Sequence, residues 1–424
     1  MKTPSACRIL VGGQVRMRGA VIGAVLLVSI ALCSGLAAED APAQRELRTY
    51  PLHGNAISAD ISPDEMLVAT LLSRSEPTDD PSNIKSIDSL QLWDFRQDKL
   101  IAEKAIQEQL RTKHEVAHQN AYVRYSADGQ FVIAYLDHYL YILRQRDLQE
   151  IRRIPLKVPP DVTRSFTTKT GPHTVVDKVE VAALELSPVG QFAAVLWVRG
   201  LSDAWVDLVQ LDSAKETVWN TKEHGVGWMR PTTITWSADG QRLLLAVPNG
   251  WACGHPGNVP DVFAVEPVSG AIKHKLTTGF LVGDIAVTPD GRVLAVDNDC
   301  VGVFRNHDPK LRVFDLYTGK KIKELSGRGG GVRYEVSASR TGDRAVADTG
   351  IVKARFDWVD MVPFDVHVDS TFSVWNLKSY EGVVTSQNLA NGLRRQSKGG
   401  GPVRLRMSPN GGFVLKGSNI YELP

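Results

Sequence analysis

The stretch that decides the fold is residues 234–247, ITWSADGQRLLLAV, and it recurs at residues 284–296 as DIAVTPDGRVLAV. In both, a short apolar run precedes a Ser/Thr-x-x-Gly tetrapeptide and a second apolar run follows it. Proline presets φ at the second turn position, the Asp side chain bonds nearby backbone, and glycine accepts a positive φ at the fourth. The pattern therefore predicts two antiparallel strands joined by a tight turn.

The same unit occurs seven times along the chain, which is typical of a repeat architecture. Only the first turn departs from the pattern, because Glu65 stands where the other six have glycine. The seven turns begin at Ser62, Ser126, Ser187, Ser237, Thr288, Ser339 and Ser408.

Most units continue with a third run in which β-branched and aromatic residues alternate with polar ones, as in residues 90–95, 311–316 and 372–377. A short turn such as residues 317–320 then leads into a fourth run at residues 322–325. Period-two alternation favours strands. Four short antiparallel strands per unit predict an all-β fold, a seven-bladed β-propeller of four-stranded antiparallel blades.

On these turns, and on the dipeptide Trp93-Asp94 with its echoes Phe314-Asp315 and Trp375-Asn376, the chain resembles the WD40-like (WD40/YVTN repeat) propeller family from Arg45 to the C-terminus. The regular Gly-His dipeptide of that family is missing. The resemblance is to a divergent bacterial member, in which the usual His-Ser-Asp-Trp hydrogen-bond network is mostly absent.

The last unit holds only three strand-like runs, at residues 402–407, 412–416 and 418–423. Residues 46–52 form an unused run near the other end of the chain. We expect this N-terminal strand to complete the last blade, which closes the ring and leaves no free sheet edge.

The N-terminal segment reads as a targeting signal. Residues 1–18 are basic, residues 19–38 carry no charge and small residues precede Glu39. This order is typical of a secretory signal peptide, with cleavage expected after Ala37 or Ala38. We expect a signal peptide at 1–38, a single propeller domain at 39–424 and a periplasmic or secreted protein. If the segment stays uncleaved, its 20 or so apolar residues can anchor the protein in a membrane.

The charge balance argues against a nucleic-acid partner. Lys and Arg number 49 and Asp and Glu 47, and four of the basic residues lie in the signal, so the mature balance is 45 − 47 = −2. No broad positive field remains. Of the four cysteines, Cys253 and Cys300 follow the signal and fall in corresponding loops of adjacent repeats. In an oxidising compartment this favours a disulfide, with two isolated buried thiols as the alternative.

Nearly all the extra length falls in connections that share one face of the ring: second-to-third strand and blade-to-blade. They span residues 73–88, 106–119, 155–178, 249–259, 298–309, 349–370 and 387–401. Insertions confined to one face indicate the binding face. Aromatic and Met side chains in or beside these connections suit protein recognition, although they can equally pack on each other and cap the channel. The binding-face candidates are Trp228, Met229, Trp251, His255, Phe356, Trp358, Met361 and Phe364.

One motif suggests an enzyme. His114-Glu115-Val116-Ala117-His118 matches His-Glu-x-x-His, which on a helix places two zinc-binding imidazoles one turn apart beside a general base. The motif lies between blades, close before the strand at residues 122–125, and no third ligand stands at the family spacing. A non-catalytic metal site with His173 or His255 is a further reading, and a solvated one-turn helix is the third.

We therefore expect an exported, non-catalytic propeller that acts as a protein-binding or scaffolding module through the loops of one face. The expected partner is a protein of the cell envelope, the chain is expected to be a monomer, and no cofactor is expected. The alternative is a metal-binding protein or zinc-dependent hydrolase that uses His114 and His118.

Overall fold

The computed structural model describes residues 44–54, 56–80, 82–112, 121–168, 171–199, 203–212, 219–221, 233–247, 261–279, 282–297, 310–326, 335–348, 352–357, 362–368, 372–386 and 404–424. Every regular element within these ranges is a β-strand. No helix in this part of the chain has the length and apolarity that a membrane crossing requires.

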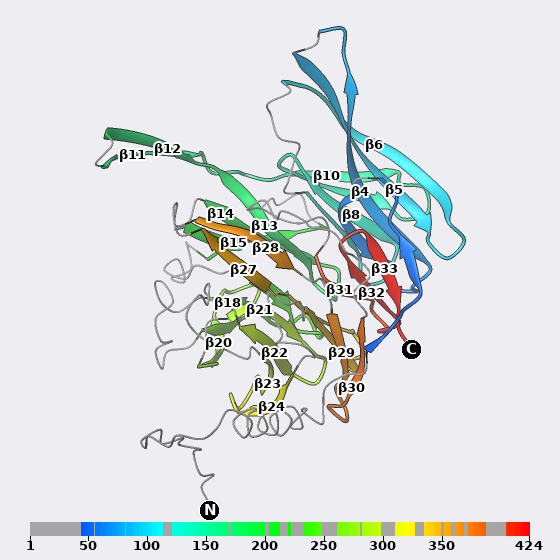
Figure 1. Ribbon diagram of the computed structural model, residues 1–424, viewed down its shortest axis with the longest axis vertical. Helices are drawn as coiled ribbons and strands as arrows, with labels where there is room; N and C mark the ends of the chain where they lie inside the picture. The colour runs from blue at the N-terminus through cyan, green and yellow to red at the C-terminus, as the bar shows by residue number, and fades with distance from the viewer. Residues whose placement is uncertain are drawn as a thin grey trace, which may run out of the picture.

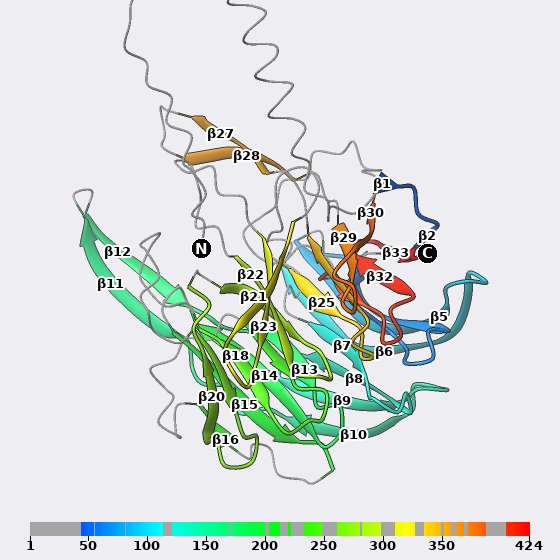
Figure 2. The same ribbon diagram turned by 90° about the horizontal axis from the view of Figure 1, so that it is seen from below.

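Most of the strands form the seven sheets of a propeller, here blades 1 to 7 in chain order, and four other strands form two separate two-stranded sheets (Figures 1 and 2). Blade 1 holds β3 (Ala56–Ile61), β4 (Leu67–Pro77), β5 (Asn83–Asp94) and β6 (Lys99–Thr112). Blade 2 holds β7 (Tyr122–Tyr125), β8 (Phe131–Leu136), β9 (Tyr139–Arg144) and β10 (Glu150–Pro155). Blade 3 holds β13 (Val179–Leu186), β14 (Phe192–Arg199), β15 (Asp203–Gln210) and β16 (Trp219–Asn220).

The remaining blades repeat the order. Blade 4 holds β17 (Thr233–Trp236), β18 (Leu243–Ala246), β19 (Val262–Val265) and β20 (Ile272–Leu276). Blade 5 holds β21 (Val282–Val287), β22 (Arg292–Asp297), β23 (Leu311–Asp315) and β24 (Lys321–Leu325). Blade 6 holds β25 (Val336–Ala338), β26 (Arg344–Asp348), β29 (Phe372–Asn376) and β30 (Gly382–Ser386). Blade 7 holds β31 (Arg406–Met407), β32 (Phe413–Lys416) and β33 (Asn419–Glu422).

Blade 7 takes its outermost strand from the other end of the chain. β2 (Thr49–Pro51) pairs antiparallel with β33, with Tyr50 opposite Ile420. The Leu52 N–H donates to the Ser418 carbonyl at 2.8 Å, and the Tyr50 hydroxyl donates to the Glu422 carboxylate at 2.7 Å. The short β1 (Gln44–Arg45) adds to β30 of blade 6 in parallel, a pairing that the sequence did not suggest. The N-terminal segment thus covers the edges of two sheets.

The core lies between neighbouring blades rather than within one. Leu71 and Leu90 of blade 1 pack with Val123 and Ala134 of blade 2, and all four are fully buried. Equivalent clusters join the other blades around the ring. Because each sheet buries both faces against its neighbours, the interblade contacts hold the ring together.

The repeated tetrapeptide forms the same hydrogen-bonded turn in successive blades. In blade 2 the Ser126 hydroxyl donates to Asp128 at 2.6 Å and accepts the Phe131 N–H at 2.9 Å. The first turn uses Glu65 at a φ of 58° in place of glycine. The Glu65 carboxylate accepts the Asn410 N–H of blade 7 at 2.9 Å, so this side chain joins the first and last blades at the cost of backbone strain.

Three insertions expected as loops are regular β-hairpins instead. Within residues 73–88, β4 and β5 stay paired from the ring out to Pro77 and Ile84, and β6 continues beside β5 as far as Thr112. Within residues 155–178, β11 (Val162–Thr168) pairs with β12 (Gly171–Asp177). Within residues 349–370, β27 (Val352–Asp357) pairs with β28 (Val362–Val368). Figures 1 and 2 both show β11–β12 projecting beyond the sheets.

Candidate functional site

The two faces of the ring differ in what they carry. Consecutive first strands, from β3 and β7 round to β31, contact one another about the centre, and blade 7 returns to blade 1 through a contact of β32 with β3. Each first strand ends at its Ser/Thr-x-x-Gly turn, so these turns share one face, the turn face. The described hairpins β4–β5, β11–β12 and β27–β28 arise in second-to-third or blade-to-blade connections, which share the opposite face, the hairpin face.

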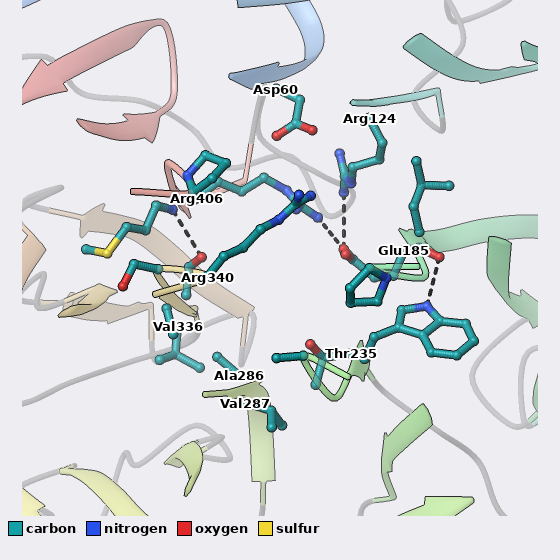
Figure 3. A pocket seen from close by; sticks show the side chains of 18 of the residues that line it. Asp60, Arg124, Glu185, Thr235, Ala286, Val287, Val336, Arg340 and Arg406 are labelled. Atoms are coloured by element: carbon teal, nitrogen blue, oxygen red, sulfur yellow. Dashed lines mark hydrogen bonds and ion pairs between the residues drawn. The ribbon is translucent and has the colours of Figure 1, made fainter. Parts of the chain in front are cut away.

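A ring of side chains from the first strands lines a polar cavity of about 190 Å³ at the turn-face end of the channel (Figure 3). Every blade contributes the residue two positions before its turn. In chain order these are Asp60, Arg124, Glu185, Thr235, Ala286, Ser337 and Arg406. Because the repeat places the same register position on the channel in each blade, seven residues far apart in sequence form one site.

The strongest electrostatic feature of this cavity is a carboxylate shared by two guanidinium groups. Glu185 accepts from Arg124 at 3.4 Å and also from Arg406 (Figure 3). Burial, together with the neighbouring Arg406 charge, lowers the pKa of Arg124 to about 10. Burial opposes ionisation of Glu185, but Arg406 and Arg124 outweigh it and hold the pKa of this carboxyl below its ordinary value. The three groups are therefore all charged at neutral pH.

A second layer of polar side chains lies deeper in the channel and ties neighbouring blades together. Asp284 accepts the Val336 N–H at 3.0 Å and the Thr233 hydroxyl at 2.7 Å. Glu335 accepts the Leu405 N–H at 2.8 Å. Burial raises the pKa of both carboxyl groups. These acids act as interblade hydrogen-bond acceptors, since each is bonded to the backbone of the next blade.

The rim of the cavity is made by residues at the second position of the turns, mostly proline and alanine. Arg340 is the exception, an exposed cation in the turn of blade 6. Its guanidinium donates to the Ala127 carbonyl of blade 2 at 3.3 Å. The Arg340 side chain therefore reaches across the channel mouth, and Figure 3 shows it extending toward the side on which Glu185 lies.

The hairpin face presents a different chemistry. The β11–β12 hairpin is a two-stranded sheet in which Val175 and Val176 are 45% and 50% exposed. β12 leads into β13 with only Lys178 between them, so the ribbon is a direct extension of blade 3. A two-stranded ribbon that exposes valines gains little stability by itself in water.

Most of the residues that the sequence singled out lie outside the described residues: Trp228, Met229, Trp251, His255, Trp358 and Met361, the cysteines Cys253 and Cys300, and His114 and His118. Phe356 falls in β27 opposite Pro363, and Phe364 falls in β28 opposite Arg355. Those two candidates therefore belong to one hairpin. Within the described ranges, no group of three or more His, Cys, Asp or Glu side chains is placed to hold a metal ion.

Sequence reasoning missed the channel ring, although its signal is present in the repeat. Asp60, Arg124, Glu185 and Arg406 all stand two residues before a turn serine. Charged residues at a fixed inward register position of several repeats are a pattern that the seven aligned turns already provide.

Comparison with known proteins supports the fold alone. No protein-family model matches the sequence, and no curated protein is similar to it. The structure is similar to a chain of the Mitotic Checkpoint Complex, with a TM-score of 0.52, 14% identity, and coverage of 91% of this chain and 98% of that one. The Cps50 (Swd1) β-propeller domain of Myceliophteria thermophila gives a TM-score of 0.49 at 12% identity, over 89% of this chain and 98% of that domain. The C-terminal WD40 domain of Sif2 gives a TM-score of 0.47 at 12% identity, over 91% of this chain and 99% of that domain. The chain is a seven-bladed β-propeller, and one of the solved structures similar to it is a WD40 domain.

Proposed function

We propose that this protein is a protein-binding or scaffolding module that engages its partner through the hairpin face. The observation that supports this most is the placement of the three described hairpins, all on one face of a ring whose other face carries short turns wherever its connections are described. A rigid ring presents such projections at fixed positions, which lowers the entropy lost on binding.

The β11–β12 hairpin has the clearest features of a contact surface. Its exposed Val175 and Val176 lie beside Thr163 and Arg164 on the paired strand. Val175 and Val176 are adjacent strand residues and so point to opposite faces of the ribbon, and each face offers one exposed valine to a partner. One structural neighbour is a chain of the Mitotic Checkpoint Complex, so this fold can form part of a complex.

The N-terminal segment supports a proposal about where the protein is located. A basic run, an apolar run and small residues before Glu39 support export. With export, we propose an envelope protein as the partner and a monomeric chain. The intact mass of the protein recovered from its native host would test this part. Cleavage after Ala37 or Ala38 is expected, and a full-length chain in the cytoplasm would contradict it.

A matched pair of surface valines tests the choice of face. Val176 on β12 and Val189 in the blade 3 turn are each 50% exposed, on opposite faces. Partners captured on tagged protein from envelope extract are quantified by mass spectrometry, and the affinity of the leading partner is then measured with purified proteins. Val176→Ser is expected to weaken binding, and Val189→Ser to leave it unchanged.

Removal of most of the β11–β12 hairpin provides a second test. Val162 and Asp177 are paired, so residues 163–176 can be replaced by an Asn-Gly turn that keeps the strand register. The shortened protein should fold, keep its unfolding temperature and lose the partner. Retention of full affinity, or equal losses in the Val176→Ser and Val189→Ser proteins, would refute binding through this hairpin.

A further inference from the structure

The turn-face mouth of the channel holds more positive than negative charge. Its lining includes four arginines, Arg124, Arg340, Arg404 and Arg406, against the three carboxyl groups of Asp60, Glu185 and Asp284. Within the described part of the chain Arg340 forms no ion pair, and its guanidinium bonds only a backbone carbonyl. The mouth therefore contains a cation whose charge no described side chain neutralises.

The acids of this channel already have donors, whereas the arginines have N–H groups to spare. Asp60 accepts the Tyr125 N–H at 2.9 Å, and Glu185 accepts from both Arg124 and Arg406. A guanidinium offers five N–H donors. Arg340 and Arg406 each use few of these in the bonds described above. The unused capacity of the site is donor capacity, which suits an anion and not a cation.

A buried donor strengthens this conclusion. Arg124 is only 5% exposed, and among the described residues its Nε has no hydrogen-bond partner. A buried N–H group without a hydrogen-bond acceptor lowers the stability of the folded protein. A ligand that accepts a hydrogen bond from this Nε would remove that cost. Arg124 lines the same cavity, and Figure 3 shows its guanidinium directed toward Glu185 at the centre.

The size and charge of the cavity limit the ligand. Its volume of about 190 Å³ is smaller than the roughly 300–1,000 Å³ of pockets that enclose drug-sized molecules. Glu185 and Asp60 repel a doubly charged anion more than a singly charged one. A carboxylate is singly charged and planar, and it matches the paired donors of a guanidinium.

We propose that the turn-face mouth of the channel is a carboxylate-binding site, in which Arg340 and Arg406 are the principal donors. The carboxylate can come from a free monocarboxylate or from the C-terminus of a peptide. This site lies on the face opposite the proposed protein-binding surface, so the two proposals stand or fall separately.

The test measures binding of acetate, phosphate and chloride to the folded full chain at constant ionic strength, from the ligand-dependent rise in unfolding temperature. A saturable rise with acetate is expected, larger than with chloride or phosphate. Arg340→Gln should weaken acetate binding by roughly tenfold to hundredfold, the effect of losing one charged hydrogen bond.

Arg152→Gln is the matched control. Arg152 is also exposed, and its guanidinium also donates to a backbone carbonyl of a neighbouring blade, that of Leu211 at 3.1 Å. This variant should bind acetate as the unchanged protein does. No saturable effect of acetate, a stronger effect of phosphate, or equal binding by the Arg340→Gln protein would overturn the proposal.

A pair of peptides separates the two sources. A short neutral peptide is compared with its C-terminal amide by calorimetry. Binding of the free acid alone, tighter than acetate, would identify a peptide terminus as the ligand. Binding of acetate without the peptide would identify a small metabolite. Equal binding of acid and amide would contradict carboxylate recognition.

Discussion

The turn face and the hairpin face are built from the same seven repeats, yet one is uniform and the other varied. On the turn face, the Ser or Thr hydroxyl that opens a turn accepts a backbone N–H of the following strand and in several blades donates to an Asp carboxylate, as in the turn that begins at Ser237. On the hairpin face the connections have no shared motif, and three described ones extend as hairpins. Stability is concentrated in the repeated part, which leaves the other face free to differ from blade to blade.

The largest expected difference in stability is between substitutions in the interblade core and substitutions in the β11–β12 hairpin. Trp197 is fully buried between blades 2 and 3, and its Nε1 donates to Asp207 at 2.8 Å. Trp197→Ala should lower the free energy of unfolding by about 3–5 kcal/mol. Val176→Ser in the hairpin should change it by less than about 0.5 kcal/mol. Urea unfolding measures both, and comparable losses would show that the hairpin belongs to the core.

Two turn glycines provide a second test, this one within the turn face. Gly190 and Gly342 both have a φ of 74°, so alanine at either position costs about 1–2 kcal/mol of backbone strain. A Cβ at Gly190 meets open space, whereas one at Gly342 comes within 2.7 Å of the Pro289 ring in blade 5. Gly342→Ala should therefore lose about 1–3 kcal/mol more than Gly190→Ala. Equal losses in thermal unfolding would mean that turns of adjacent blades do not pack together.

The charged network in the channel is expected to contribute more to the free energy of unfolding than ion pairs on the outer strands do. Glu185→Gln removes the charge that Arg124 and Arg406 share and should cost about 1.5–3 kcal/mol. The control is Glu150→Gln, which breaks an exposed pair with Arg153 and should cost less than about 1 kcal/mol. If chemical denaturation gives similar small losses for both, the channel charges are solvated and not a structural network.

The smallest expected effect on stability concerns a buried acid directly before β19 of blade 4. Asp261 is 2% exposed and bonds Thr278, and burial raises its pKa from 3.8 to about 6. The folded state holds this proton more tightly than the unfolded state does. The associated stability is therefore full below pH 3.8 and is lost as the pH rises through about 6. Unfolding temperatures between these pH values should fall less steeply for Asp261→Asn, and parallel slopes would contradict the shift.

The seven turns were sufficient to predict the blades, because a turn that bonds its own backbone requires little from the rest of the chain. The sequence also indicated residues 46–52 as a strand to pair with the last blade, and β2 lies on β33. The hairpins were not foreseen, since strands such as β11 and β12 are polar and mostly exposed and so lack the alternation that marks a half-buried strand. The charged channel was not predicted because the residues two positions before the turns differ in type from blade to blade and so form no repeated motif.

Hydrogen–deuterium exchange of the protein, alone and with its captured partner, tests the central claim that a fixed ring presents one variable binding face. The account predicts slow exchange in the first strands throughout. Protection on partner binding should be confined to the hairpin face, above all to residues 162–177. Partner-induced protection of the turns, such as residues 187–190 or 237–240, with none in the hairpins, would contradict it.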